Sequence, residues 1–553
     1  MSSNLRRRVL QAGAVTLAGG TLFAAIGAAS GPGSDLSAVP TANQRAAGYA
    51  PATKLSAELA QSTVAQGSVA LENPHGIVTH YGYENDVPTA DNPALPQMLP
   101  TPASATEAIK TEPDKNTYLV FKQGSPGADP AYDYGSHFLY QGHENAAKNA
   151  AGASLGLLTR INLDADAAHR VTLMATEDTD GNPLATIDGS TWDPFAQRLI
   201  LTTESAAKPT YAATATFPSR VEDVSGALGR GGYEGVQDDS DGNVWIVEDI
   251  GGAAKAGTAA KIPNSFVYRY VPKTPGDLHN GTLQALQVMN SAGQPITLES
   301  QTALNAPDQV LLHSYGHALD TRWVTIHDTA TNGSAPFNAN TAAKAAHATP
   351  FKRPENGVFR PGTKFGEFEF TETGDTNATS PENGAAADGA GGAGGWGVIQ
   401  TLVQHDPSAD TGKLHLLFRS GAATSSFDNL QFAGRDELVA VQDAGDGLHG
   451  QINALDSGFR LDAGADYSNT ANQAARWLAE GRDASATIDA ANAGFGKNDG
   501  DNEITGIHIS DGDPGVSGIL GAKTPMPFKV GWRWFYTQQH GDNSTYEVLP
   551  AGG

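Results

Sequence analysis

The sequence contains no cysteine among its 553 residues. This absence excludes disulfide bridges, a thiol nucleophile and every metal site that uses thiolate ligands. Basic residues are also scarce, with 35 Lys and Arg against 60 Asp and Glu and a formal net charge of -25. A surface this acidic repels phosphate backbones and anionic lipids. We therefore expect neither nucleic acid nor a membrane surface as a partner. The charge balance instead predicts a soluble protein that gathers cations.

The chain also lacks an apolar run long enough to span a membrane comfortably, about 20 residues. Its N-terminus carries Arg6 and Arg7 within Leu-Arg-Arg-Arg-Val-Leu, followed by an Ala- and Gly-rich stretch over residues 12–29. This pattern is typical of a twin-arginine signal peptide, and we assign it to residues 1–30. We therefore expect recognition by the twin-arginine export machinery and a periplasmic or extracellular location.

Glycine and proline are abundant, at 64 and 31 residues, which favours a loop-rich all-β protein over a helical bundle. Residues 31–115 read as an extended leader that packs on the body, and residues 116–553 as the body itself. The Gly- and Ala-rich residues 373–395 predict a flexible insertion. Helical signals are few, and the best is at residues 470–481.

An internal repeat gives the body its architecture. Each copy has an acidic residue, a strand, a turn, a second strand and a closing polar residue. The spacing is 15 residues from Glu234 to Asp249 and again from Asp428 to Asp443, and 16 from Asp188 to Glu204. A looser fourth copy opens at Glu503 and closes near His540. Recurrent hairpins of this kind predict a β-propeller, here of five to six blades with loop and small helical insertions.

In a propeller, the opening and closing acids of each hairpin can meet at one rim of the central channel. The alternative is that these residues simply terminate strands, as Asp and Asn do in many turns. Converging carboxylates need a cation between them, and oxygen ligands suit calcium. The candidate metal ligands are Glu144, Glu204, Glu234, Asp249, Glu355, Asp428 and Glu503. The acidic residues 178–182 lack the closing glutamate of an EF-hand and read as a turn.

Arg353 stands in the segment Phe-Lys-Arg-Pro-Glu, next to the candidate ligand Glu355. Its guanidinium could bind an oxyanion such as phosphate while the carboxylate binds metal. A surface ion pair is the alternative interpretation of these five residues.

The order of these motifs resembles the PhoX-type alkaline phosphatases over residues 115–545. The matching segments are His143-Glu144, Leu201 to Glu204, Glu234-Gly235, residues 244–249 and 266–270, residues 323–326, Arg353-Pro354-Glu355, Asp428-Asn429 and residues 535–541. The resemblance implies a calcium-dependent propeller phosphatase with a metal cluster at the channel mouth and a small phosphate ester as substrate. It makes Glu204, Glu234, Asp249, Glu355 and Asp428 metal ligands, and Arg353 the catalytic residue that holds phosphate.

The chain departs from the family at Thr203, where the family has a cysteine that binds iron, and Ser205 replaces a second acid that is frequent there. Threonine cannot supply a soft anionic ligand, so several calcium ions are expected and iron stays an open alternative. We place His540 with Arg353 at the substrate and expect a monomer. Two further hypotheses remain from the sequence: a non-enzymatic, calcium-stabilised exported propeller, or another propeller hydrolase such as a lactonase or phytase.

Overall fold

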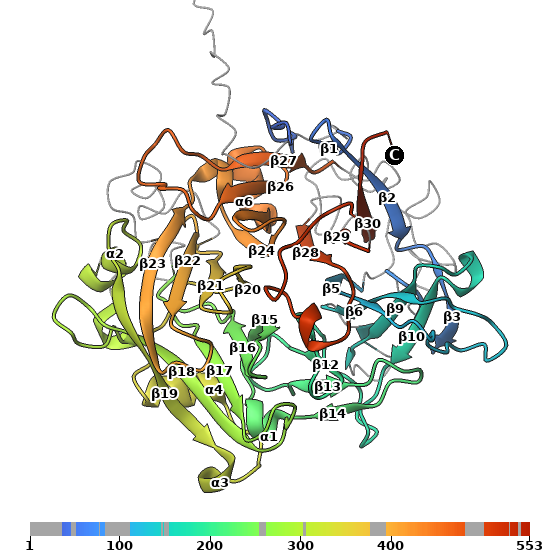
Figure 1. Cartoon of the computed structure of the whole chain (residues 1–553), viewed down its shortest axis with the longest axis horizontal. Helices are drawn as coiled ribbons and strands as arrows, with labels where there is room; N and C mark the ends of the chain where they lie inside the picture. Colours follow the sequence, from blue (N-terminus) through green and yellow to red (C-terminus); the bar gives the residue numbers. More distant parts are fainter. Residues whose placement is uncertain are drawn as a thin grey trace, which may run out of the picture.

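The computed structural model describes residues 36–45, 51–76, 78–82, 111–144, 147–148, 154–253, 261–301, 306–375, 394–481, 503–529, 531–539 and 543–552. Within them, antiparallel sheets radiate from a central axis, as the ring of strands in Figure 1 shows. Six strands lie innermost and contact one another in a closed circle, in the order β5, β11, β15, β20, β24, β28 and back to β5. This closed circle confirms the all-β propeller, and the described residues form six blades.

The first three blades follow one another along the chain, each with four strands in sequence order from the axis outward. The first has β5 (Pro113–Val120), β6 (His137–His143), β9 (Leu158–Asn162) and β10 (Val171–Ala175). The second has β11 (Ser190–Asp193), β12 (Arg198–Leu201), β13 (Tyr211–Ala213) and β14 (Val221–Asp223). The third has β15 (Tyr233–Asp238), β16 (Val244–Glu248), β17 (Val267–Pro272) and β18 (Gly281–Val288).

Of the last three blades, the fifth and the sixth each add a strand from the N-terminal part of the chain. The fourth has β20 (Gly357–Phe359), β21 (Glu367–Glu372), β22 (Val398–Gln404) and β23 (Thr411–Arg419). The fifth has β24 (Phe427–Phe432), β25 (Glu437–Gln442), β26 (Ser457–Asp462), β27 (Ala475–Ala479) and the edge strand β1 (Lys54–Leu55). The sixth has β28 (Glu503–Ser510), β29 (Arg533–Gln539), β30 (Ser544–Pro550) and the outermost strand β2 (Leu59–Ala65).

Few elements lie outside these blades. The strand β19 (Leu319–Asp328) pairs with both β18 and β23, and so joins the third and fourth blades into one nine-stranded sheet. Two small hairpins are β3 (Ala70–His75) with β4 (Val78–His80), and β7 (Ala147–Lys148) with β8 (Ser154–Leu155). The helices are α1 (Ser225–Leu228), α2 (Pro307–Leu312), α3 (Thr329–Asn332), α4 (Ala339–Ala345) and α6 (Gly445–Ile452), with 3-10 turns η1 (Ala167–His169), η2 (Leu298–Gln301), η3 (Ala422–Thr424) and η4 (Val516–Gly518).

The hairpin β15–β16 shows why the repeat folds as it does. Asp239 accepts hydrogen bonds from the backbone N–H groups of Asp241 and Asn243, and Gly242 supplies the left-handed residue of the turn with φ 82°. Asp and Gly at these places form a tight turn at low steric cost. The strands on either side are buried on both faces, because neighbouring blades cover them. Apolar packing between blades is dense, as where Trp245 contacts Phe359 and Phe368 at ring distances of 5.1 and 5.0 Å.

The predicted helix at residues 470–481 is wrong. Residues 475–479 form strand β27, between β26 and β1. Both faces of the second half of this strand are covered, so Trp477 and Leu478 are each fully buried. The sequence therefore lacks the alternation of apolar and polar residues that is typical of a half-exposed strand. By contrast, residues 178–182 form the predicted turn, in which Asp178 accepts backbone hydrogen bonds from Asp180 and Asn182.

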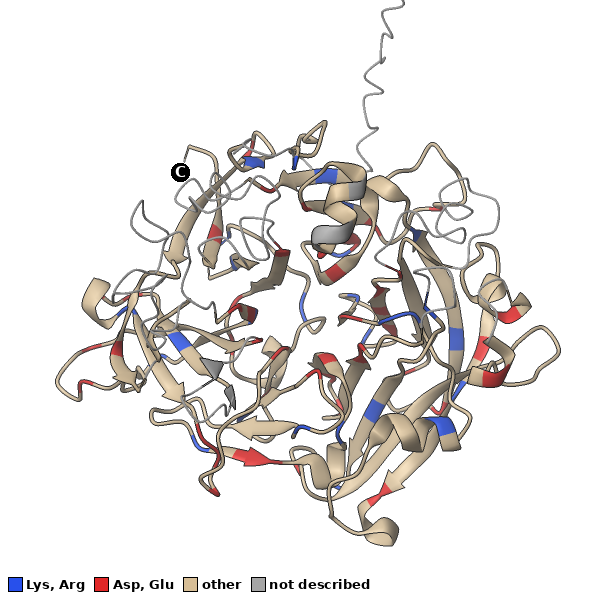
Figure 2. Ribbon diagram, turned by 180° about the vertical axis from the view of Figure 1, so that it is seen from behind, with Lys and Arg blue, Asp and Glu red and all other residues tan. Residues whose placement is uncertain are grey.

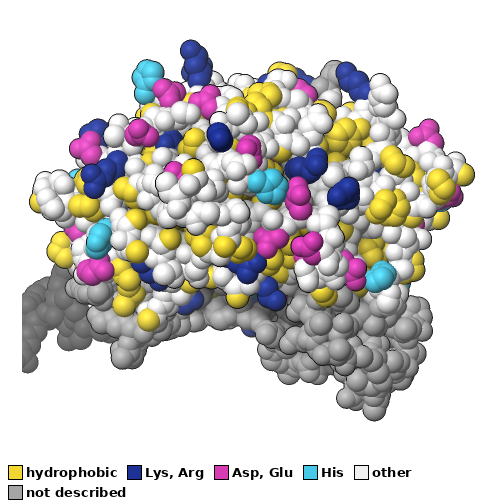
Figure 3. Space-filling view, turned by 90° about the horizontal axis from the view of Figure 1, so that it is seen from below, with side chains coloured by type: hydrophobic (Ala, Val, Ile, Leu, Met, Phe, Trp, Pro, Cys, Tyr) yellow, Lys and Arg dark blue, Asp and Glu magenta, His cyan; other side chains and the backbone are white. Residues whose placement is uncertain are grey.

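Acidic residues on the outside differ in arrangement from those inside. On the face shown in Figure 3, side chains of both charges and apolar side chains are interspersed over the described part. In the ribbon of Figure 2, many acidic segments instead lie near the axis. Part of the acid surplus is therefore internal.

Candidate metal centre

An acidic residue marks the start of each of the six innermost strands. It is the first or second residue of the strand, or it lies two residues before the strand. These six residues, here called the carboxylate ring, are Asp114, Asp188, Glu234, Glu355, Asp428 and Glu503. Five of them are buried, and Glu503 is partly exposed. Because the six strands circle one axis, one carboxylate from every blade points to the same end of the channel.

A second set of acids closes the hairpins on the same rim. Glu144 follows β6, Glu204 follows β12, Asp249 follows β16 and Asp443 follows β25. In the fourth blade the corresponding residue is Thr373, whose hydroxyl donates a hydrogen bond to Glu355. In the sixth blade it is His540, which lies outside the described residues.

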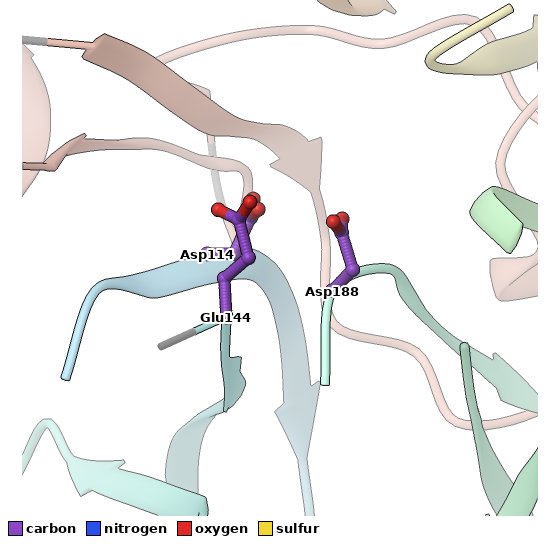
Figure 4. Close-up of side chains that lie close together, drawn as sticks. All are labelled: Asp114, Glu144 and Asp188. Carbon is purple, nitrogen blue, oxygen red and sulfur yellow. The ribbon is translucent and has the colours of Figure 1, made fainter. Parts of the chain in front are cut away.

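Carboxylates from the two sets converge in three groups. Within each group, one oxygen per residue lies within 4.8 Å of the others. The groups are Asp114 with Glu144 and Asp188, Asp188 with Glu204 and Glu234, and Glu234 with Glu355 and Asp428. Figure 4 shows the first group, in which all three carboxylates point the same way. Asp188 and Glu234 each belong to two groups, so the three groups form one continuous arc.

The electrostatics of this arc favour bound protons or a bound cation. Burial, and then the neighbouring acids, raise the pKa of Asp188 and Glu234 well above the usual range. Burial raises the pKa of Asp114 to about 6. Glu204 reaches the solvent, but the surrounding protein and Asp249 raise its pKa to about 7. A metal-free arc therefore holds protons near neutral pH, because so many charged carboxylates cannot stay together unpaired.

The donor atoms fit a divalent metal ion. Asp188 Oδ2, Glu234 Oε2 and Asp428 Oδ2 are buried and have no hydrogen-bond partner among the described residues. Unpaired buried oxygens are costly unless an ion or water completes them. All the converging ligands are carboxylate oxygens, the type of donor that calcium prefers.

Arg353 lies beside the arc and is held by Asp249. Its Nε lies 2.9 and 3.0 Å from the two Asp249 oxygens, and its Nη2 lies 2.6 Å from Oδ2. Nη2 also lies 3.3 Å from Glu355. Burial disfavours the charge, but Asp249 and Glu355 outweigh it and hold the pKa of Arg353 above its usual value. The guanidinium is therefore a fixed cation next to the converging carboxylates.

The backbone at Arg353 is left-handed, with φ 58°. Its carbonyl accepts a hydrogen bond from Thr373 N at 2.8 Å, and the preceding amide, Lys352 N, donates to Glu372 at 2.7 Å. A non-glycine residue in this conformation costs about 1–3 kcal/mol and persists where the surroundings impose it. The surrounding hydrogen bonds thus hold this backbone conformation at the arginine that lies beside the carboxylates.

Lys115 is buried below the arc and reaches across the channel from the first blade. Its Nζ donates to Asn429 Oδ1 at 3.0 Å and to the carbonyl of Ile507 at 3.4 Å, in the fifth and sixth blades. Burial lowers its pKa to about 8, while Asp428, Asp114, Glu234 and Asp188 act in the opposite direction.

Thr203 stands near the arc but is turned away from it. It is buried, and its hydroxyl donates a hydrogen bond to the carbonyl of Pro209 at 3.0 Å. A hydroxyl bonded to the backbone does not replace a thiolate, so this position does not fit the iron ligand of the family.

The structure brings together five of the seven proposed ligands, Glu144, Glu204, Glu234, Glu355 and Asp428, in the three groups. Asp249 instead pairs with Arg353, and Glu503 lies in the ring outside the three groups. Arg6, Arg7 and His540 lie outside the described residues. Sequence analysis missed two members of the arc, Asp114 and Asp188. Asp188 already stood at the start of one copy of the repeat. Asp114 could have been found because it lies at the start of a strand, as the other ring acids do.

The comparisons with known proteins agree with this architecture. A model of the family described as alkaline phosphatase PhoX matches residues 258–514. The structure of Pseudomonas fluorescens PhoX in complex with vanadate, a transition state analogue, is similar with a TM-score of 0.51 at 12% identity, covering 92% of this chain and 98% of that one. At this identity, the likeness establishes a shared fold.

Other similarities are weaker. The GH43_1 enzyme from Xanthomonas citri reaches a TM-score of 0.28 at 11% identity, covering 64% of this chain and 87% of that one, which is too low to bear on the fold. No curated protein matches the chain in sequence. Residues 258–514 therefore resemble the PhoX-type family, and the chain shares the fold of Pseudomonas fluorescens PhoX.

Proposed function

We propose that this protein is an exported, calcium-dependent phosphatase that hydrolyses phosphate monoesters at the rim of the propeller channel. The family resemblance and the fold support this proposal. The observation that carries it is the arc of converging carboxylates with an arginine at its side. An anionic substrate needs positive charge at such a site, and the arc gathers that charge as metal ions.

The charge balance supports several ions. The carboxylate ring and the four closing acids supply ten carboxylates, and Lys115 and Arg353 are the two basic side chains described beside them. Glu144, Asp188, Glu204, Glu234, Glu355 and Asp428 would hold calcium, with Asp114 as a further ligand. When bound, such ions would neutralise the phosphate oxygens and activate a water molecule.

Arg353 would bind and orient the ester. Asp249 and Glu355 occupy its Nε and Nη2, and none of the hydrogen bonds among the described residues uses Nη1. The free edge can donate to a phosphate oxygen while Asp249 fixes the plane of the guanidinium. Because the site is largely buried, this interaction is stronger than it would be in water.

The export route and the metal type complete the proposal. Arg6 and Arg7 would direct the folded, metal-loaded protein through the twin-arginine machinery, and the protein would act as a monomer. Among the described residues, no helix has the length and apolarity to cross a membrane. Thr203 does not fit the iron site, so we propose calcium alone.

The test measures hydrolysis of p-nitrophenyl phosphate at alkaline pH, with elemental analysis of the same preparation. We expect bound calcium and turnover that a calcium chelator abolishes. Arg353→Ala should lower kcat/KM by about 100- to 1,000-fold, the usual cost of removing one charge-stabilising donor, with the calcium content unchanged. Full activity in Arg353→Ala would exclude the role of this residue.

A non-enzymatic, calcium-stabilised propeller is the second candidate. The turned-away hydroxyl of Thr203 and the tight pairing of Arg353 with Asp249 favour it. It predicts a large rise in Tm on adding calcium and no turnover of any phosphate ester, so the same preparation distinguishes the two candidates.

A further inference from the structure

Lys115 occupies an unusual place, because its charge interacts with several carboxylates and it forms an ion pair with none of those that the structure describes. Among the described residues, the printed partners of its ammonium are the neutral oxygens of Asn429 and Ile507. Its charge interacts with Asp428, Asp114, Glu234 and Asp188, which come from four different blades. A cation shared in this way neutralises a set of carboxylates without blocking the oxygens of any one of them.

Asn429 connects this lysine to the arc. Its Oδ1 accepts from Lys115 at 3.0 Å, and its Nδ2 donates to Asp428 Oδ1 at 2.6 Å. The other oxygen, Asp428 Oδ2, has no hydrogen-bond partner in the described chain, and Asp428 belongs to the group with Glu234 and Glu355. The Asn429 amide thus occupies one oxygen of Asp428 and leaves the other available to a cation.

Lys115 also marks a chemical boundary in the channel. Beyond it lies a cavity of about 30 Å³ whose lining includes Thr117, Ser190, Gln237 and His508. These side chains follow the ring acids along the same innermost strands. Burial lowers the pKa of His508 to about 3, so this side chain is neutral. The ring carboxylates therefore lie on one side of the ammonium. The cavity on the other side is lined mainly by uncharged side chains, and its one acidic residue, Asp513, pairs with Lys523.

We propose that Lys115 is the built-in cation of the carboxylate ring, which closes the inner side of the metal centre and orients Asp428 through Asn429. This inference rests on the proposed metal centre. It makes Lys115 a positioning residue that supplies one positive charge before any metal binds. The ring then needs fewer ions, and metal is confined to the outer side of the ammonium.

The decisive experiment compares the stability of metal-stripped and calcium-saturated protein in wild type and Lys115→Met. Methionine keeps the unbranched shape and removes the charge. The stripped variant should have a lower Tm than stripped wild type, and calcium should raise its Tm by roughly 5 °C more than it raises that of wild type. An equal or smaller calcium effect would overturn the proposal, and so would a variant that stays unfolded in saturating calcium.

Lys352→Met is the matched control. Lys352 is also buried, but it pairs with a single carboxylate, Asp375, at 2.8 Å. Its loss should lower the Tm of stripped and calcium-loaded protein alike. If calcium rescues both variants equally, the effect of Lys115 is not specific to the ring.

Asn429→Leu tests the link to Asp428 separately, because it keeps the ammonium. Calcium affinity, measured by titration calorimetry, should fall by about 10- to 100-fold, as is usual when a ligand loses its orienting partner. Unchanged affinity would overturn this part of the proposal. If calcium leaves the Tm of wild type unchanged, the proposed metal centre fails instead, and the lower Tm of stripped Lys115→Met still reports on the lysine.

Discussion

The strands β11 and β15 are acidic at both ends, and the two ends behave differently. At the rim, Asp188 and Glu234 start the strands and converge with other carboxylates. At the far ends, Asp193 and Asp238 close the same strands, and no group of three acids there converges within the described residues. We refer to Asp193, Asp238 and the adjacent Asp239 as the far cluster. Burial is common to both ends, so burial alone does not make a metal site.

Hydrogen bonding accounts for two of the three acids of the far cluster. In the far cluster, Asp193 Oδ1 accepts from the backbone of Phe195 and Ala196, and Asp239 Oδ2 accepts from Trp245 and Asn243. These carboxylates build turns. Asp238 forms no hydrogen bond through either oxygen in the described part of the chain, and burial and then Asp193 raise its pKa well above the usual range. Burial and Asp193 thus favour the protonated form of Asp238, whereas the acids of the rim lie where they can share cations.

The substitution Glu234→Gln is the strongest test of this difference between the two ends. Glu234 belongs to two of the three groups, so removing its charge should weaken two sites at once. We expect calcium affinity to fall by at least about 100-fold and the calcium-dependent rise in Tm to shrink with it. Titration calorimetry and thermal unfolding measure both. An affinity equal to wild type would mean that the arc is not the calcium site.

A smaller effect should be seen in the pH dependence of metal-stripped protein. The folded-state pKa values of Asp114 and Glu204 are raised, to about 6 and about 7, so the native protein holds protons that the unfolded chain releases. Stability should therefore be greatest below about pH 4 with respect to these groups and fall as the pH rises to 7.

Saturating calcium should reduce or reverse this dependence, because it replaces the protons. Urea unfolding of stripped and calcium-loaded protein between pH 4.5 and 8 provides the measurement. A stripped protein that gains stability over this range would contradict the proposed electrostatics.

The smallest effect is expected for Asp238→Asn, which serves as the control for Glu234→Gln. Because burial favours the uncharged form of the Asp238 carboxyl, an amide of the same shape should change the free energy of unfolding by no more than about 1 kcal/mol. Calcium binding should be unaffected, as judged by the same titration. Any loss of calcium affinity here would show that the two ends are coupled.

Much of the site could be predicted because the repeat preserves a distance. In the hairpins from Asp188, Glu234 and Asp428, short turns keep the opening and closing residues 15 or 16 positions apart. The first blade escaped detection because the β5–β6 connection is long and separates Asp114 from Glu144 by 30 positions. The fourth blade escaped because its closing residue is Thr373, which has no charge to recognise.

Other features depend on contacts between distant segments. In the sequence, Asp249 follows a strand in the same way as Glu204. Asp249 is nevertheless the partner of the Arg353 guanidinium, which depends on where Arg353 and Glu355 lie in space. Lys115 stands beside Asp114 in the sequence like an ordinary surface pair. Its reach to Asn429 and Ile507 follows from the closure of the ring, which brings the first, fifth and sixth blades together.

The pairing of β2 with β30 has a consequence for how the chain can fold. The register joins Leu59 to Pro550 and Thr63 to Tyr546, so the outermost strand of the sixth blade comes from the opposite end of the sequence. Contacts of such sequence separation form slowly, since a very long loop must close first. On the ribosome, the N-terminal strand has to wait until the last blade has been synthesised. The sixth blade therefore gains its outermost strand only after β30 has been synthesised.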